Sequence, residues 1–193
     1  MDNFKFIEFF KTLRNENPGK GKPIILLKYK PYNKNEIEME YSIDYIQSQI
    51  DDCNCGLLIT NGECSFGNNI FSTIFLLNNL KYPYAFVETN TCDLNYLSDN
   101  TSQKTNQDVQ IIYSPKISNK NNFIKAYKNL GIIQLDHRIK IKIVICDETF
   151  EYNEKYLNYL CDLKLNDRVY IISDDINKNK ISNFTPEILE LVK

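Results

Sequence analysis

The chain has 193 residues, of which 42% are hydrophobic and 25% charged, ordinary values for a globular domain with its own core. Its formal net charge of -2 gives no basic field for nucleic acid, and no apolar run approaches the roughly 20 residues that span a bilayer. The first residues lack the basic and apolar regions of a signal peptide, so we expect a cytoplasmic location without nucleic-acid or membrane partners.

Apolar runs and helical periodicity organise the first part of the chain. Residues 4–13 are apolar and aromatic and fit a strand or a short helix, and a loop rich in proline and glycine follows. Residues 24–29 predict a strand, whereas residues 30–41 are polar without a clear period. Ser42 is a suitable N-cap for a predicted helix over residues 43–50.

Strand and helix patterns then alternate to the end of the chain. This alternation predicts an α/β fold with a parallel sheet and right-handed crossovers, in one domain over residues 1–193. In order, we expect a strand at 56–60, a helix over 70–77, a strand at 84–89 and a long polar loop over 90–107 with at most a short helix. There follow a strand at 109–113, a helix over 123–130 closed by Gly131, a strand at 139–145, a helix over 156–163, a strand at 169–172 and a C-terminal helix over 185–192.

Polar turns follow three successive predicted strands, at the edge where parallel α/β folds place their sites. They are Thr-Asn-Gly-Glu at 60–63, Glu-Thr-Asn-Thr at 88–91 and Ser-Pro-Lys at 114–116. In this order and spacing they resemble the turns of the 7-carboxy-7-deazaguanine synthases, which read Thr-Gly-Gly-Glu-Pro, Glu-Thr-Asn-Gly-Thr and Ser-Pro-Lys. These are small radical S-adenosylmethionine (SAM) enzymes with a partial βα barrel.

The N-terminal segment extends the resemblance. Residues 8–18 and 21–28 resemble the family's opening Glu-Ile-Phe-Tyr-Ser-Ile-Gln-Gly-Glu-Gly-Pro, its Gly-Arg-Pro and the strand that comes next, without a gap. The resemblance covers residues 6–172. It implies that the α/β fold is an incomplete parallel (βα) barrel of the radical SAM type, and it implies a homodimer.

The resemblance also implies roles for the turn residues. The acid of the first turn would face the amino group of SAM, which is a sensible charge-assisted pair. The SAM-binding residues would be Thr60, Asn61, Gly62, Glu63 and Ser114, and the substrate-binding residues would be Glu16, Glu88, Thr89, Asn90 and Lys116.

The main departure from the family lies in the cluster loop. In the same register, Tyr32, Glu36 and Met39 fall on the three cysteines that hold the 4Fe–4S cluster, and Tyr41 falls on the threonine linked to Mg²⁺. None of the three replaces a thiolate in such a cluster. Without the cluster no electron reaches the sulfonium of SAM, so no radical forms. We therefore assign no catalytic residue and no metal ligand.

The leading hypothesis is a diverged 7-carboxy-7-deazaguanine synthase homologue, from the pathway to queuosine and other 7-deazaguanines, that binds SAM or a pterin without radical turnover. One alternative is an active lyase of the same pathway with a non-standard cluster site. The other is a non-catalytic interaction scaffold. Whether the chain is an enzyme stays open between these alternatives.

Six cysteines are too few for a disulfide scaffold, so we expect reduced thiols. Cys64, Cys92 and Cys146 each follow a predicted strand, and a secondary metal or redox site is a hypothesis for them. Cys53 and Cys55 precede the strand at 56–60, whose length of about 16 Å separates them from Cys64. They fit buried or incidental thiols.

Overall fold

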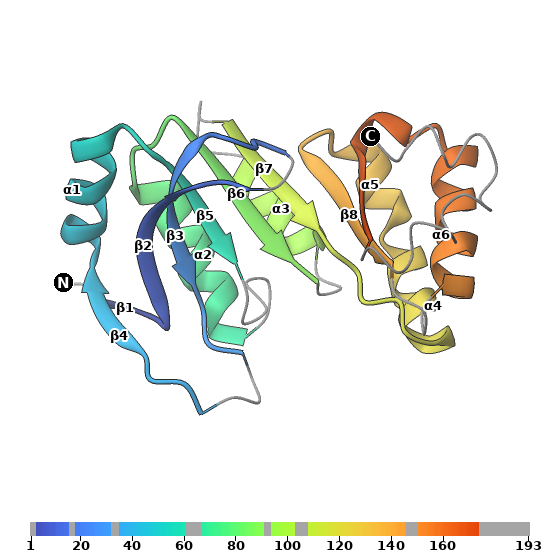
Figure 1. The fold of residues 1–193 in the computed structure, drawn as a ribbon, viewed down its shortest axis with the longest axis horizontal. Coiled ribbons are helices and arrows are strands. Elements are labelled where there is room, and N and C mark those ends of the chain that lie inside the picture. Colours follow the sequence, from blue (N-terminus) through green and yellow to red (C-terminus); the bar gives the residue numbers. More distant parts are fainter. Residues whose placement is uncertain are drawn as a thin grey trace. The chain divides into compact units, whose positions relative to one another are not determined.

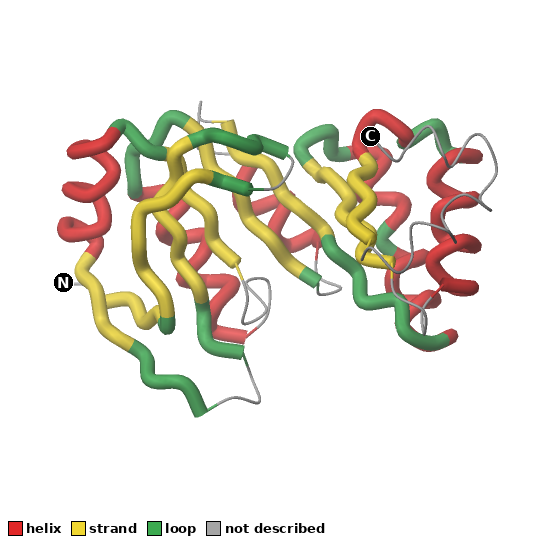
Figure 2. Tube along the Cα trace, in the orientation of Figure 1, coloured by secondary structure: helices red, strands yellow, loops and turns green. Residues whose placement is uncertain are grey.

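A computed structural model of the protein describes residues 3–15, 18–31, 35–60, 67–90, 94–102, 108–145 and 150–173. The chain forms two compact units, Met1–Ile111 and Ile112–Lys193, which are described one at a time. The expectation of a single domain stays a prediction. Helices and strands alternate in both units (Figures 1 and 2), which confirms the α/β class.

The first unit contains most of the strands. Its strands are β1 (Asn3–Phe6), β2 (Glu8–Leu13), β3 (Pro23–Lys28), β4 (Met39–Ser42), β5 (Gly56–Thr60), β6 (Tyr84–Thr89) and β7 (Asp108–Tyr113), the last of which continues past Ile111, the last residue of this unit. Its helices are α1 (Ile43–Cys53), α2 (Gly67–Asn79) and α3 (Leu94–Ser102).

In the main sheet of this unit, the strands follow the order β2-β3-β5-β6-β7. β2 and β3 form an antiparallel hairpin, while β3, β5 and β6 run parallel to one another. Helices α2 and α3 lie together on one face of the sheet (Figure 1). β1 and β4 form a separate antiparallel pair. The prediction of a parallel sheet is therefore confirmed for its central strands, with β2 as an antiparallel addition.

Alternation along the strands divides the side chains of the sheet between two faces. On one face, Leu57 and Ile59 of β5 and Val87 of β6 are fully buried. On the other, Leu58 and Phe86 lie side by side and are also buried. Burial on both faces explains why β5 reads as a continuous apolar run, as expected for a central parallel strand.

The second unit pairs β8 (Ile139–Ile145) with β9 (Val169–Ser173) in parallel. Its helices are α4 (Lys120–Lys128), α5 (Leu130–Leu135) and α6 (Phe150–Asp162), and the short 3₁₀ helix Asn166–Arg168 leads into β9. Between α4 and α5, the buried Asn129 donates a hydrogen bond from its side-chain amide to the Tyr113 hydroxyl at 3.0 Å.

Most of the expected elements are confirmed, with small differences in their ends. The N-terminal segment, for which strand and helix stayed open, forms β1 and β2. The segment over residues 90–107, where we expect a loop with at most a short helix, contains the 9-residue helix α3. The expectation for Gly131 is wrong, because it lies inside α5 instead of closing a helix. Residues 39–42, in a segment without a clear period, form β4. The expected helix over residues 185–192 lies outside the described residues.

In the part of the chain that the structure describes, no helix combines the length and the apolar character that crossing a bilayer requires.

Candidate functional site

A row of polar side chains crosses the carboxyl edge of the parallel strands in the first unit. The strand register places Glu8 beside Lys28 and Lys28 beside Thr60, and continuing the register from β5 to β6 places Thr60 beside Glu88. Neighbours in register share a face of the sheet. Four adjacent strands therefore present a carboxylate, an ammonium group, a hydroxyl and a second carboxylate on one face, which we call the polar row.

The members of the polar row contact one another in pairs. The Lys28 ammonium group forms an ion pair with the Glu8 carboxylate, and the Thr60 hydroxyl donates a hydrogen bond to Glu88 at 3.2 Å. The Lys28 side chain is 24% exposed and that of Glu8 is 39% exposed. These groups are partly desolvated yet reachable from solvent, which is the condition under which charged groups bind small ligands well.

At the amino end of the same face, residues 14 and 18–22 pack against the aromatic residues of β6. The Arg14 guanidinium lies 4.7 Å from the centre of the Phe86 ring, and its Nε donates to the Pro18 carbonyl at 2.6 Å. The Lys22 ammonium group lies 4.5 Å from the centre of the Tyr84 ring. This turn therefore contacts the aromatic residues of β6 at the end of the strand opposite to the polar row.

Two residues of the Glu-Thr-Asn-Thr turn, Glu88 and Thr89, lie on opposite faces of β6. Glu88 belongs to the polar row, whereas Thr89, the next residue, is only 3% exposed and lies on the other face. Asn90 follows the strand and is half-buried. The structure thus places Thr60 and Glu88 together among the expected ligand-binding residues and separates Thr89 from them.

Ser114 and Lys116 belong to the second unit, in the segment between β7 and α4. Ser114 is half-buried and Lys116 is exposed, while their neighbours Pro115 and Ile117 are buried. The two apolar neighbours anchor the segment and leave the polar side chains at its surface. The remaining expected residues lie outside the described part of the chain, as do the cysteines of the hypothetical secondary site: Glu16, Asn61, Gly62, Glu63, Cys64, Cys92 and Cys146.

The positions that the resemblance assigns to the iron–sulfur cluster do not fit that group. Met39 stands in β4, is half-exposed, and accepts a hydrogen bond from the Tyr41 hydroxyl at 3.7 Å. The Tyr41 ring stacks on Phe9 with 4.5 Å between ring centres, and Glu36 offers only a carboxylate. Tyr32 lies outside the described residues. Among those described, no three histidine, cysteine or acidic side chains form a group that could hold a metal ion.

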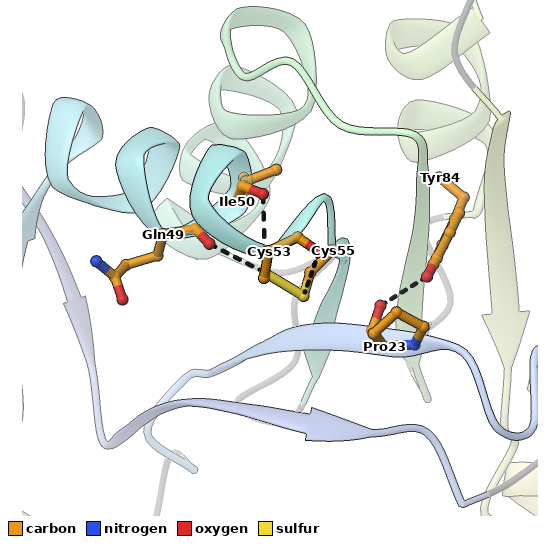
Figure 3. Close-up of a disulfide and its surroundings, with 6 residues drawn as sticks. All are labelled: Pro23, Gln49, Ile50, Cys53, Cys55 and Tyr84. Carbon is orange, nitrogen blue, oxygen red and sulfur yellow. Dashed lines mark hydrogen bonds between the residues drawn. A yellow bond between two sulfur atoms is a disulfide. The ribbon is translucent and has the colours of Figure 1, made fainter.

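The cysteines next to β5 differ from the expectation of reduced thiols. Cys53 and Cys55 form a disulfide at the end of α1 (Figure 3). Their Cα atoms are 5.2 Å apart, within the usual range for a disulfide. The expectation of a reduced pair was wrong because composition says nothing about a local turn that brings two cysteines together. Cys161, in α6, is a half-buried cysteine that takes part in no disulfide.

Sequence reasoning did not assign a role to Glu8 or Lys28. The sequence does contain an indication of such a role, since each is a charged residue at the end of a strand whose other residues are mostly apolar. The sequence could not show that the two strands form a hairpin whose register puts Glu8 opposite Lys28.

A comparison with models of known protein families finds no match for this chain, and a comparison with curated proteins finds no similar sequence.

Proposed function

We propose that the chain is a diverged homologue of the 7-carboxy-7-deazaguanine synthases that binds SAM or a pterin at the polar row, without radical turnover. The observation that carries the proposal is the position of this row. Thr60 and Glu88 begin the two turns that resemble the family's turns, and they meet at the carboxyl edge of adjacent parallel strands. That edge is where parallel α/β folds bind their ligands.

The charges of the row match a zwitterionic ligand such as the amino-acid end of SAM. The Glu88 carboxylate and the Thr60 hydroxyl offer acceptors for an ammonium group, and the Lys28 ammonium group offers a partner for a carboxylate. Charge-assisted hydrogen bonds of this kind are about twice as strong as neutral ones. A carboxylated pterin would use the same ammonium group, so both ligand classes fit the proposal.

The absence of turnover in this proposal rests on the residues at the cluster positions. Glu36 and Met39 supply no thiolate, and the protein part of such an enzyme only binds and orients the group that supplies the electron. The proposed role is therefore binding, and no residue of the row is assigned to catalysis.

The strand order supports a partial barrel of the radical SAM type. In the first unit each strand of the main sheet pairs with the strand of that sheet that follows it along the chain. Right-handed crossovers between strands in this order place their helices on one face and leave the other face to enclose a site. A doubly wound sheet would instead reverse its strand order at some point. The proposal includes a cytoplasmic location, a homodimer and a place in the synthesis of 7-deazaguanines.

Calorimetric titration with SAM, and separately with 6-carboxytetrahydropterin, tests the proposal. Lys28→Met and Glu88→Gln should weaken binding of the ligand by about tenfold or more, because each removes a charged partner of the ligand worth roughly 1.5–3 kcal/mol. Lys5→Met and Glu40→Gln are the matched controls, since they change an exposed ion pair of β1 and β4. Heat signals that are absent for both ligands would contradict the proposed binding role.

A second measurement separates the proposal from an active enzyme. After anaerobic reconstitution with iron and sulfide, we expect no stoichiometric cluster and no 5′-deoxyadenosine from SAM. Formation of a cluster together with SAM cleavage would overturn the absence of turnover and leave the ligand-binding part of the proposal standing.

A further inference from the structure

A pair of cysteines joined by one residue lies at the amino end of β5, the opposite end of this strand from Thr60. Cys53 is the last residue of α1, Asn54 caps the helix, and Cys55 directly precedes the strand. Neither cysteine belongs to the polar row. The chemistry of this pair is therefore independent of ligand binding at that row.

The cap of the helix brings the two sulfur atoms together. Asn54 has left-handed backbone angles, with φ 48° and ψ 43°, and its N–H donates to the Ile50 carbonyl. The N–H of Cys55 also donates to Ile50, at 3.3 Å. Asparagine is one of the few residues that adopt this conformation readily. The turn is fixed by backbone hydrogen bonds, so it does not depend on the disulfide to hold its shape.

Solvent access differs between the two sulfur-bearing residues. Cys55 is fully buried, whereas Cys53 is half-exposed. The Cys53 sulfur also lies 3.1 Å from the Gln49 carbonyl oxygen and 3.7 Å from that of Ile50 (Figure 3). A reduced thiol at Cys53 therefore has acceptors for its proton without any movement of the backbone. The site accommodates both the thiol and the disulfide.

A structural role explains this disulfide poorly. In the chain-entropy account, a disulfide stabilises the folded state by closing a loop, and the effect falls as the loop shortens. This loop contains one intervening residue, Asn54, so the stabilisation is small. In a reducing compartment such as the proposed cytoplasmic location, disulfides are usually transient and serve catalysis or redox sensing.

We infer that Cys53 and Cys55 form a redox-active pair that exchanges with low-molecular-weight disulfides of the glutathione class. The Cys53 thiolate attacks one sulfur of the small disulfide, which forms a mixed disulfide and releases one small thiolate. The Cys55 thiolate then attacks the Cys53 sulfur, closes the protein disulfide and releases the second thiolate. The protein loses two electrons and two protons, and the small disulfide gains them.

The assignment of the two roles depends on access. The attacking sulfur must be reachable by the small molecule, which Cys53 is, and the resolving sulfur needs only to reach its neighbour. The reverse reaction with excess small thiol begins with attack on the same exposed sulfur.

The test uses the full chain, first reduced with dithiothreitol and freed of reductant under anaerobic conditions. Oxidised glutathione is added, free thiols are trapped with N-ethylmaleimide at increasing times, and digestion followed by mass spectrometry locates each modification. We expect the peptide with Cys53 and Cys55 to change from doubly alkylated to disulfide-bonded. When reduced glutathione is in excess, the peptide should again be doubly alkylated.

Two variants test the roles of the cysteines. Cys55→Ser should accumulate a stable glutathione adduct at Cys53, because the resolving thiol is missing. Cys53→Ser should lower the rate of adduct formation in this peptide at least about tenfold, because the remaining thiol is buried. Cys161→Ser is the control and should leave exchange at the pair unchanged. A pair that stays fully alkylated in oxidised glutathione, or a disulfide that native protein keeps in excess reduced glutathione, would overturn the inference.

Discussion

The fold leaves no space for a side chain at Gly56. A Cβ atom there would overlap the Tyr84 ring and lie 2.7 Å from the Tyr84 carbonyl oxygen. The ring cannot swing away easily, because its hydroxyl donates a 2.6 Å hydrogen bond to the Pro23 carbonyl (Figure 3). Glycine at the start of a central strand is thus explained by close approach between neighbouring strands.

We expect Gly56→Ala to lower the free energy of unfolding by roughly 1–3 kcal/mol, the usual cost of overpacking a core. Urea denaturation measures the change. Gly131→Ala is the matched control, because a Cβ at this helical position would have nothing within 4 Å. It should raise the free energy of unfolding by roughly 0.5–1 kcal/mol through helix propensity. Equal effects of the two substitutions would show that the contact with Tyr84 is unimportant.

The ion pair in the polar row contributes little to folding, and this makes it useful for testing ligand binding. Lys28 and Glu8 are both partly exposed, and such pairs stabilise proteins by at most about 1 kcal/mol. We expect Glu8→Gln to change the free energy of unfolding by less than about 1 kcal/mol, measured by urea denaturation. A larger loss would mean that the pair serves the hairpin of β2 and β3, and that a binding defect of Lys28→Met reflects misfolding.

At the scale of single elements, the start of helix α1 is stabilised by its N-cap residue. Ser42 has extended backbone angles, and its hydroxyl accepts a hydrogen bond from the Tyr45 N–H at 3.2 Å. Ser42→Ala should lower the free energy of unfolding by about 1 kcal/mol, because that N–H loses its partner. Ser48→Ala removes an exposed hydroxyl from the interior of the same helix and should be neutral or slightly stabilising. Thermal denaturation of both variants checks the difference.

Helix α5 depends on a residue far along the chain. The Arg168 guanidinium is buried and donates to the Ile133 carbonyl and, at 3.1 Å, to the Asp136 carbonyl at the end of the helix. It also lies 3.0 Å from the His137 Nδ1. A cation at the carboxyl end of a helix satisfies carbonyl groups that lack partners within the helix.

We expect Arg168→Met to lower the free energy of unfolding by roughly 2–4 kcal/mol, because it leaves buried carbonyl groups without their charged donor. Lys128→Met, at an exposed position of α4, controls for the loss of a positive charge. Urea denaturation provides the comparison. The proposed role of Arg168 fails if the two substitutions have the same small effect.

Local patterns predicted the elements whose signal lies within the segment itself. Ser42 and the apolar spacing after it defined α1, and the apolar run of residues 56–60 defined β5. β4 has no such signal, because its residues are exposed or half-buried and it pairs with β1, far away in the sequence. Glycine is common just after helices, which is why the pattern predicts a helix end at Gly131, whereas this residue lies near the start of α5, one residue after α4.

At the scale of the whole molecule, the sequence located half of the polar row. Thr60 and Glu88 end predicted parallel strands, so their proximity followed from the fold class. Glu8 and Lys28 joined them only through the register of an antiparallel hairpin, which is a long-range property. The disulfide escaped prediction for a different reason, since it depends on the left-handed conformation of the single residue Asn54.

The stability of the whole molecule should fall at alkaline pH, because both units bury tyrosine hydroxyls. Burial raises the pKa of Tyr82 and of Tyr156 above the usual value of about 10. Their hydroxyls donate to the carbonyls of Leu77, at 2.8 Å, and Ala126, at 3.4 Å. Above about pH 10 the unfolded chain loses these protons while the folded chain keeps them.

Each buried tyrosine should therefore lower the free energy of unfolding by about 1.4 kcal/mol per pH unit above pH 10, whereas its contribution is fully present below that pH. Urea denaturation between neutral and alkaline pH measures the slope. Tyr82→Phe and Tyr156→Phe should each make it shallower, although each also costs about 1 kcal/mol at neutral pH through a lost hydrogen bond. Tyr127→Phe changes a ring that is 47% exposed and should leave the slope as it is. If all three variants keep the slope of the parent protein, then Tyr82 and Tyr156 do not cause the alkaline loss, and other groups whose pKa differs between the folded and the unfolded chain account for it.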